Sequence, residues 1–188
     1  MEKEISLIFP QWQGYGLSTK LADGARLIAS QLSSSYTCAT VAVELREDLT
    51  IQNGILGYAS ILRQLDYARS LLLEENPSRI LTVGGDCGVE VAPISFLNHR
   101  YDQSITVIWL DAHGDLNTPM LSPSGHFHGM PLRVLMGDGD LPSSFDSVGS
   151  DSFSGWGKLV FPKSLSFPRP TILDLLVVMS PSIICCIL

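Results

Sequence analysis

Positive charge is scarce in this sequence. Its 188 residues include 12 Lys and Arg against 19 Asp and Glu, which gives a formal net charge of −7. A protein that binds a nucleic-acid backbone neutralises phosphates with many cationic side chains, so this balance argues against a nucleic-acid partner. A negative surface instead attracts small cationic molecules.

Cysteines are also few, and the four present lack the regular spacing of a disulfide framework. We therefore interpret them as reduced thiols. The first residues, MEKE, contain no basic segment leading into a long apolar stretch, so the sequence does not indicate secretion. A hydrophobic content of 45% in a chain of this length is sufficient for one domain with a substantial core. Together these features predict a cytoplasmic protein.

Long hydrophobic runs are missing except near the C-terminus. The apolar segment 171–188 is interrupted by Asp174 and Pro181, and it barely reaches the roughly 18 to 20 residues that span a bilayer. Its last four residues, CCIL, formally match a prenylation box, but no polybasic segment accompanies them. We therefore do not expect a membrane anchor.

Short apolar segments alternate with longer amphipathic ones along the first 135 residues or so. The patterns predict strands at 5–9, 39–44, 79–83 and 104–110, and helices at 19–32, 57–75, 89–99 and from about 130. Strands that alternate with helices indicate an α/β fold, a three-layer sandwich with a mainly parallel sheet. Ligands of such sheets bind beyond the carboxyl ends of the strands.

The run WLDAHGDLN at 109–117 contains the strongest chemical signal. Alternate residues of an extended segment share one face, so Asp111, His113 and Asp115 can converge just beyond the strand if the extension continues. Two carboxylates and an imidazole suit a divalent ion such as Mn²⁺, and the lack of thiolates in the run argues against a structural zinc site. An alternative is that these residues simply form a turn.

Two further polar clusters accompany this run: GGDC at 84–87 and SGHFHGMP at 124–131. The order and content of the three clusters resemble the ureohydrolase family, which comprises arginases, agmatinases, formimidoylglutamases and their relatives. The segment LIFPQWQGYG at 7–16 resembles the opening strand of bacterial arginase-like members. The resemblance covers roughly the first three quarters of the chain.

The resemblance implies hydrolysis of a C–N bond in a small cationic guanidino or amidine compound by two Mn²⁺ ions, which such sites hold about 3.5–4 Å apart. Asp111 would bridge both ions, His113 would bind one and Asp115 the other. His128 would carry a proton to the departing amine, because an imidazole can gain and lose a proton near neutral pH. Three residues match the positions that orient the non-reacting end of the substrate: Asn117, Ser124 and His126. Relatives commonly form trimers or hexamers, so the resemblance allows for a homo-oligomer.

Cys87 departs from the family pattern, because arginases and agmatinases have a metal-binding His at this position. Soft sulfur binds Mn²⁺ poorly. Either the metal preference of the site is altered, or Cys87 is a small buried residue after the strand, and the second interpretation is slightly favoured. We expect the preceding Asp86 to stabilise the turn at the strand end rather than bind metal.

A second departure is the lack of another strand ending in Asp-x-Asp downstream of the His-Gly segment, which the family needs for the remaining ligands. The segment 138–140, DGD, has the spacing but no apolar strand before it. We therefore expect an arginase-like domain at 1–141, truncated so that the C-terminal part of the sheet is missing, and a divergent tail at 142–188. Such a tail should pack loosely and be cut first by proteases between 142 and 170.

These departures leave two hypotheses. The chain is either a manganese-type hydrolase with one ion or none and weak turnover, or a non-catalytic fragment that acts by associating with a full-length relative.

Overall fold

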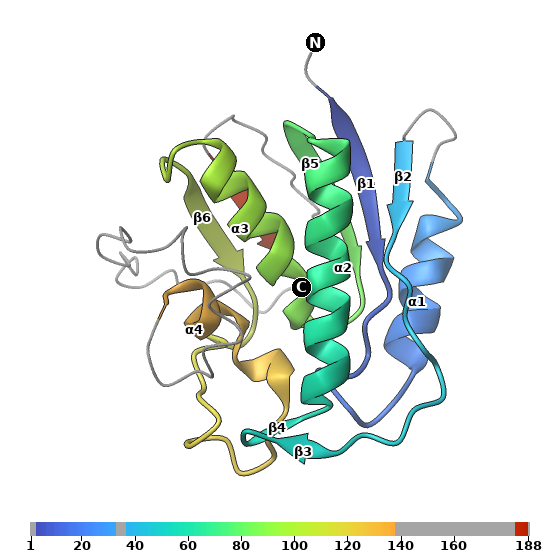
Figure 1. Cartoon of the computed structure of the whole chain (residues 1–188), viewed down its shortest axis with the longest axis vertical. Coiled ribbons are helices and arrows are strands. Elements are labelled where there is room, and N and C mark those ends of the chain that lie inside the picture. Colours follow the sequence, from blue (N-terminus) through green and yellow to red (C-terminus); the bar gives the residue numbers. More distant parts are fainter. Residues whose placement is uncertain (1–2, 33–36, 138–182, 188) are drawn as a thin grey trace, which may run out of the picture.

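The computed structural model describes residues 3–32, 37–137 and 183–187, and it has an α/β architecture (Figure 1). Three parallel strands form its main sheet in the order β2-β1-β5. These strands are β2 (Thr37–Thr40), β1 (Glu4–Phe9) and β5 (Arg79–Gly84). β1 lies in the centre, which explains why five of its six residues are buried.

Helices cover both faces of this sheet. The chain leaves β1 toward β2 through α1 (Lys20–Ala29) and returns past β1 to β5 through α2 (Tyr58–Glu75). Because crossovers between parallel strands are right-handed, this reversal places α1 on one face and α2 on the other. α3 (Val91–Arg100) packs against α2 (Figure 1). The arrangement is the expected three-layer sandwich.

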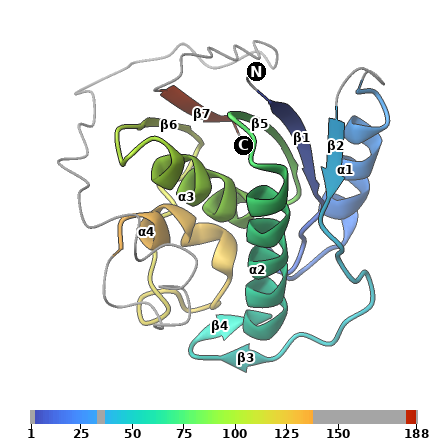
Figure 2. The same ribbon diagram turned by 45° about the horizontal axis from the view of Figure 1, so that its top comes forward.

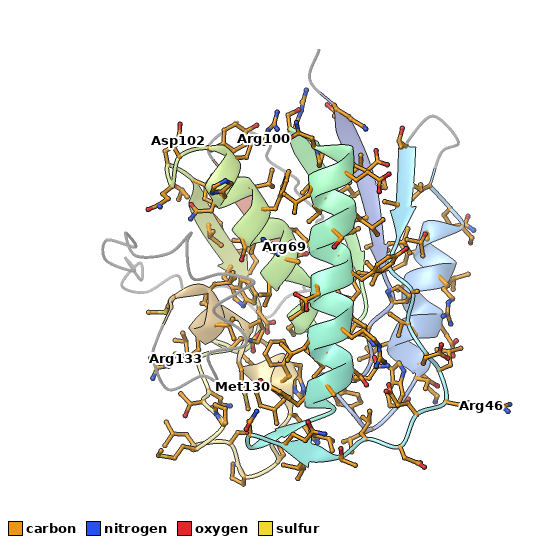
Figure 3. All side chains as sticks on the ribbon, in the orientation of Figure 1. Arg46, Arg69, Arg100, Asp102, Met130 and Arg133 are labelled. Carbon is orange, nitrogen blue, oxygen red and sulfur yellow. The ribbon has the colours of Figure 1, made fainter. Side chains whose placement is uncertain are left out.

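The core lies mainly between the sheet and the α2–α3 layer. Its fully buried side chains include Phe9, Ile61, Leu65, Ile94 and Phe127. Phe127 belongs to a 3-10 turn, η2 (Phe127–Gly129), which leads into α4 (Pro131–Leu135). Figure 3 shows Met130 at this junction among interior side chains, whereas Arg100 and Asp102 lie at the opposite end of the molecule. The motif-bearing loop at 124–131 is therefore anchored in the core.

β6 (Thr106–Leu110) lies apart from the main sheet, with no ladder joining it to β5 in the described part of the chain. It pairs in parallel with β7 (Ile183–Ile187), and Figure 2 shows the two strands side by side. On β6, Val107 and Trp109 pack against the core, whereas Ile108 and Leu110 keep 40% and 47% of their surface exposed. One face of this strand is thus left largely uncovered.

The predicted strands and helices agree with the observed ones to within a few residues, and two findings differ. The sequence patterns predict no strand in the tail, which we expect to pack loosely, but its residues 183–187 form β7. Sequence patterns also missed a hairpin of β3 (Ile51–Gln52) and β4 (Ile55–Leu56). Its turn is Asn53-Gly54, both residues with positive φ, which is a strong hairpin signal.

The segment 138–182 lies outside the described residues, and the expected domain boundary at 141 and the protease-sensitive stretch at 142–170 fall within it. Both stay predictions. Among the helices that the structure describes, none combines the length and apolar character needed to cross a membrane.

Candidate metal centre

Loops that follow β1, β5 and β6 meet at the carboxyl ends of the strands (Figure 1). The strand order β2-β1-β5 means that the chain moves outward from β1 first to one side and then to the other, and ligands of parallel sheets bind at such a point. Cys87 follows β5 at the start of a 3-10 turn, η1 (Cys87–Glu90), and Asp111 directly follows β6. Asp115 comes four residues later with φ of 49°, a left-handed conformation that Asp tolerates. The chain has already left the extended conformation by this point, because β6 ends at Leu110.

Cys87, Asp111 and Asp115 form a compact cluster of potential metal ligands. One ligand atom from each lies within 4.8 Å of the others. The Cys87 thiol donates to Oδ2 of Asp111 over 3.7 Å. Asp115 is 5% exposed, and its Oδ2 has no hydrogen-bond partner among the described residues. The cluster thus combines two carboxylates with one thiol.

His113 does not join this cluster. Its side chain is 84% exposed, although its Nδ1 lies 3.5 Å from Oδ1 of Asp111. β6 ends at Leu110, so residues 111–113 no longer alternate faces as in a strand. The backbone N–H of His113 donates to Oδ1 of Asp111 at 2.8 Å, as in an Asx turn. The expected convergence of three side chains therefore holds for Asp111 and Asp115 but not for His113.

Asp86 stabilises the turn after β5, as expected. Its Oδ1 accepts from the backbone N–H of Gly88 at 3.0 Å and caps η1. Its Oδ2 accepts from the backbone N–H of Tyr15 at 3.2 Å, which ties the loop after β1 to the loop after β5. Burial raises the pKa of Asp86 to about 6, against the opposing effect of these hydrogen bonds and of the nearby His128.

Close packing explains two glycines of this turn, Gly85 within the GGDC segment and Gly88 directly after it. A Cβ on Gly85 would lie 1.8 Å from the carbonyl oxygen of Gln11 and 2.6 Å from its nitrogen. A Cβ on Gly88 would lie 2.7 Å from Oε1 of Gln11 and 2.8 Å from Cδ1 of Phe127. These positions accept no side chain without movement of their neighbours, so the glycines bring three segments of the site together.

Two histidines of the SGHFHGMP segment lie beside Tyr15. The ring centroids of His128 and Tyr15 are 5.5 Å apart, and those of His126 and His128 are 5.7 Å apart. Nδ1 of His128 lies 3.1 Å from the carbonyl oxygen of Gly14, and its backbone N–H donates to the same oxygen. Burial, together with the nearby His128, lowers the pKa of His126. Sequence reasoning did not single out Gly14 or Tyr15, although both lie in the LIFPQWQGYG segment.

The side chains of Asn117 and Ser124 lie on the exposed surface of the same loop. The Asn117 N–H donates to the carbonyl oxygen of Gly129 at 2.9 Å, and Oγ of Ser124 accepts from the N–H of His126 at 3.4 Å. The β3–β4 hairpin supports this loop, because the N–H of Leu56 donates to the carbonyl oxygen of Gly125. The residues expected to contact substrate therefore lie on one loop, which these hydrogen bonds help to hold in place.

The surroundings of the cluster raise the pKa of two of its members, Asp115 and Cys87, and so disfavour their charged forms. Burial and the adjacent Asp111 raise the pKa of Asp115, against the nearby Cys87, His128 and His113. Burial raises the pKa of the Cys87 thiol, as do Asp115, Asp111 and Asp86. A divalent cation would reverse these effects by favouring the deprotonated forms.

Two carboxylates fit a divalent cation, and the buried, unpartnered Oδ2 of Asp115 is an acceptor that a cation would satisfy. The thiol fits Mn²⁺ less well than it fits softer ions. We conclude that the donor set is suited to one divalent ion, with three protein ligands drawn from two loops.

Comparisons with known proteins identify relatives for most of the chain. The model of the arginase family matches residues 19–155. Over 101 residues the chain is 41% identical to an arginase of Staphylococcus aureus (strain MRSA252), which covers 52% of this chain and 33% of that protein. An arginase of Bacillus subtilis (strain 168) is 49% identical over 59 residues, 31% of this chain and 20% of that protein. The chain thus matches about a third or less of the length of these relatives.

Solved arginase structures share the fold. The structure of Entamoeba histolytica arginase in complex with L-ornithine has a TM-score of 0.65 at 23% identity, covering 79% of this chain and 53% of that one. The arginase structure from Bacillus cereus has a TM-score of 0.61 at 26% identity, covering 80% and 52% respectively. About half of each of those chains therefore has a counterpart here.

Proposed function

The chain belongs to the arginase family, and from this we propose that it is a manganese-type hydrolase of C–N bonds in a small guanidino or amidine compound, with impaired turnover. The observation that supports the proposal is the cluster of Cys87, Asp111 and Asp115 at the carboxyl ends of the strands. Its place in the fold is where parallel α/β sheets bind their ligands. We place this activity in the cytoplasm.

Asp111 and Asp115 would hold the metal. His113 lies beside Asp111 and would act on the metal only indirectly, through its contact with that carboxylate. When bound, divalent ions acidify water and polarise a carbon centre that is otherwise a poor electrophile. The protein's own contribution would be to bind and orient the substrate. The formal charge of −7 favours the approach of a cationic guanidinium.

His128 would move a proton between solvent and the departing amine. Its ring is fixed by the contact with Gly14 and by packing against Tyr15, both on the loop after β1. His126, Asn117 and Ser124 would orient the non-reacting end of the substrate, because they lie on the same loop as His128. Burial, together with the nearby His128, lowers the pKa of His126, a direction that favours a hydrogen-bonding role over a cationic one.

Impaired turnover is expected because the sequence has no second strand ending in Asp-x-Asp after the His-Gly segment. The ligands of this cluster are too few to fill the coordination positions of two Mn²⁺ ions. The purified chain of 188 residues should therefore hydrolyse arginine or agmatine slowly or not at all.

Urea release with saturating Mn²⁺ tests this proposal. We expect a rate far below the roughly 1 to 10³ per second of ordinary enzymes, lost in Asp115→Asn and reduced in His128→Asn. Full turnover would contradict the impairment, and slow release that both variants leave unchanged would contradict the assigned site. Asp66→Asn, an exposed position on α2, is the control and should match the wild type.

A second candidate function is association with a full-length relative. It is favoured by exposed apolar side chains on two strands, Leu81 on β5 and Ile108 and Leu110 on β6, which are 39%, 40% and 47% exposed. Co-expression with a full-length arginase-family protein, followed by size-exclusion chromatography, would detect a mixed assembly. Elution of the two chains in separate peaks would contradict it.

A further inference from the structure

We propose that Cys87, Asp111 and Asp115 form a site for one thiophilic divalent cation, Zn²⁺ or Co²⁺, in preference to Mn²⁺. Such an ion would occupy the metal site of the proposed function in place of Mn²⁺, so this inference rests on that site and changes the identity of its ion. Cys87 is the donor that departs from the family pattern, because it adds a sulfur atom to the two carboxylates of the cluster.

The separation of the donors fits a single small ion. Zinc binds thiolate at about 2.3 Å and carboxylate oxygen at about 2.0–2.2 Å, so two such donors at the tetrahedral angle lie about 3.6 Å apart. Sγ of Cys87 lies 3.7 Å from Oδ2 of Asp111. All three ligand atoms lie within 4.8 Å of one another, so the third donor must move closer to the other two to share one ion with them.

Asp115 provides an independent indication of a ligand. It is 5% exposed, and its Oδ2 has no hydrogen-bond partner in the described part of the chain, although it belongs to the same cluster. Buried carboxylate oxygens in folded proteins are almost always satisfied by a donor or a cation. A bound ion would supply the missing partner.

Sulfur determines which ion is preferred. Thiolates select zinc and other soft or borderline ions, whereas Mn²⁺ prefers oxygen and nitrogen donors. Binding would release the Cys87 thiol proton to solvent and form a metal–sulfur bond, with no change in oxidation state. Three protein donors would leave a fourth position open to solvent or substrate, as in catalytic zinc sites.

Titration of the metal-free 188-residue protein with Co²⁺, followed by absorption spectroscopy, tests the proposal. A cobalt–thiolate bond gives a charge-transfer band in the near ultraviolet that oxygen donors do not give. We expect this band to saturate at one Co²⁺ per chain, to disappear on addition of Zn²⁺ and to persist in an equal concentration of Mn²⁺.

The variant Cys87→Ser should lose the band and bind Co²⁺ and Zn²⁺ at least tenfold more weakly, since even indirect changes at metal sites cost about 10–100-fold. Its affinity for Mn²⁺ should change little, because a hydroxyl replaces a donor that Mn²⁺ uses poorly. Cys38→Ser and the double variant C185S/C186S are matched controls that should keep the band. Circular dichroism should show the same fold in all variants.

Persistence of the band in Cys87→Ser would overturn the proposal. Tight Co²⁺ binding without the band would also overturn it, while leaving the metal site of the proposed function intact. Failure to bind Co²⁺, Zn²⁺ or Mn²⁺ would remove the metal site itself and, with it, the proposed function. The three results are thus distinguishable without measuring hydrolysis.

Discussion

Replacement of Gly85 by Ala should strongly destabilise the protein, because this residue lies against the backbone of another loop. The added Cβ would approach the carbonyl oxygen of Gln11 to 1.8 Å, whereas ordinary contacts begin at 3.4 Å. Either the segment of Gly85 or the segment of Gln11 must therefore move by roughly 1 Å or more, which is a severe case of overpacking. Neither partner is the flexible end of a side chain, so the strain cannot be relieved by a rotamer change.

The expected loss combines two effects. Overpacking of a tightly packed site costs about 1–3 kcal/mol. The displaced Gln11 carbonyl oxygen also accepts the N–H of Asp86 at 3.0 Å, and loss of such a hydrogen bond costs about 0.5–1.5 kcal/mol. We therefore expect Gly85→Ala to lower the free energy of unfolding by about 2–4 kcal/mol.

Gly24→Ala is the matched control. Gly24 lies in the middle of α1, and a Cβ there would meet nothing within 4 Å. The same chemical change should therefore raise the free energy of unfolding by about 0.5–1 kcal/mol through helix propensity. Urea denaturation followed by circular dichroism measures both variants, and equal midpoints, or a loss at Gly85 below about 1 kcal/mol, would refute the packing argument.

Two other variants test polar side chains that stabilise the fold, Asp86 beside the candidate metal centre and Glu47 elsewhere. Asp86→Ala removes the acceptor for the N–H groups of Gly88 and Tyr15, so it should cost about 1–3 kcal/mol, whereas the exposed Asp66→Ala should stay within about 0.5 kcal/mol of wild type in the same urea denaturation. At Glu47, burial raises the pKa, but hydrogen bonds from Ser60, Gln13 and Arg63 outweigh it and the pKa is lowered overall from 4.5. Glu47 therefore stabilises the fold above pH 4.5, and this contribution is lost as the pH falls through the lowered pKa. When the free energy of unfolding is measured as a function of pH, Glu47→Gln should lose less stability in acid than the wild type does. An identical loss of stability in both proteins would contradict the assignment.

The order and type of the main elements could be predicted because the local patterns agree with the final fold. The long helix at 58–75 has regular apolar spacing and ends at Asn76 before a proline, and the structure ends it there. β7 could not be predicted, since pairing between residues about 75 positions apart leaves no local pattern. The sequence pattern also placed His113 with Asp111 and Asp115, but alternation applies only while a strand continues.

The site was partly predictable for the same reason. Motif residues at strand ends could be assigned to one edge of the sheet from topology alone. Which side chains meet there depends on the backbone after the strand, and the positive φ of Asp115 gives no reliable local signal. The role of Tyr15 depends on a contact with Asp86 across 71 positions of the chain, which a single sequence does not reveal.

The most direct test of the central claim is an anomalous-difference map from crystals of the 188-residue chain grown with saturating Mn²⁺ and, separately, with Zn²⁺. We expect a peak from at least one of these ions within bonding distance of Asp111 and Asp115, and we expect no such peak in Asp115→Asn. A map without a peak at these carboxylates for either ion, or a peak that the variant retains, would contradict a metal centre built on this cluster.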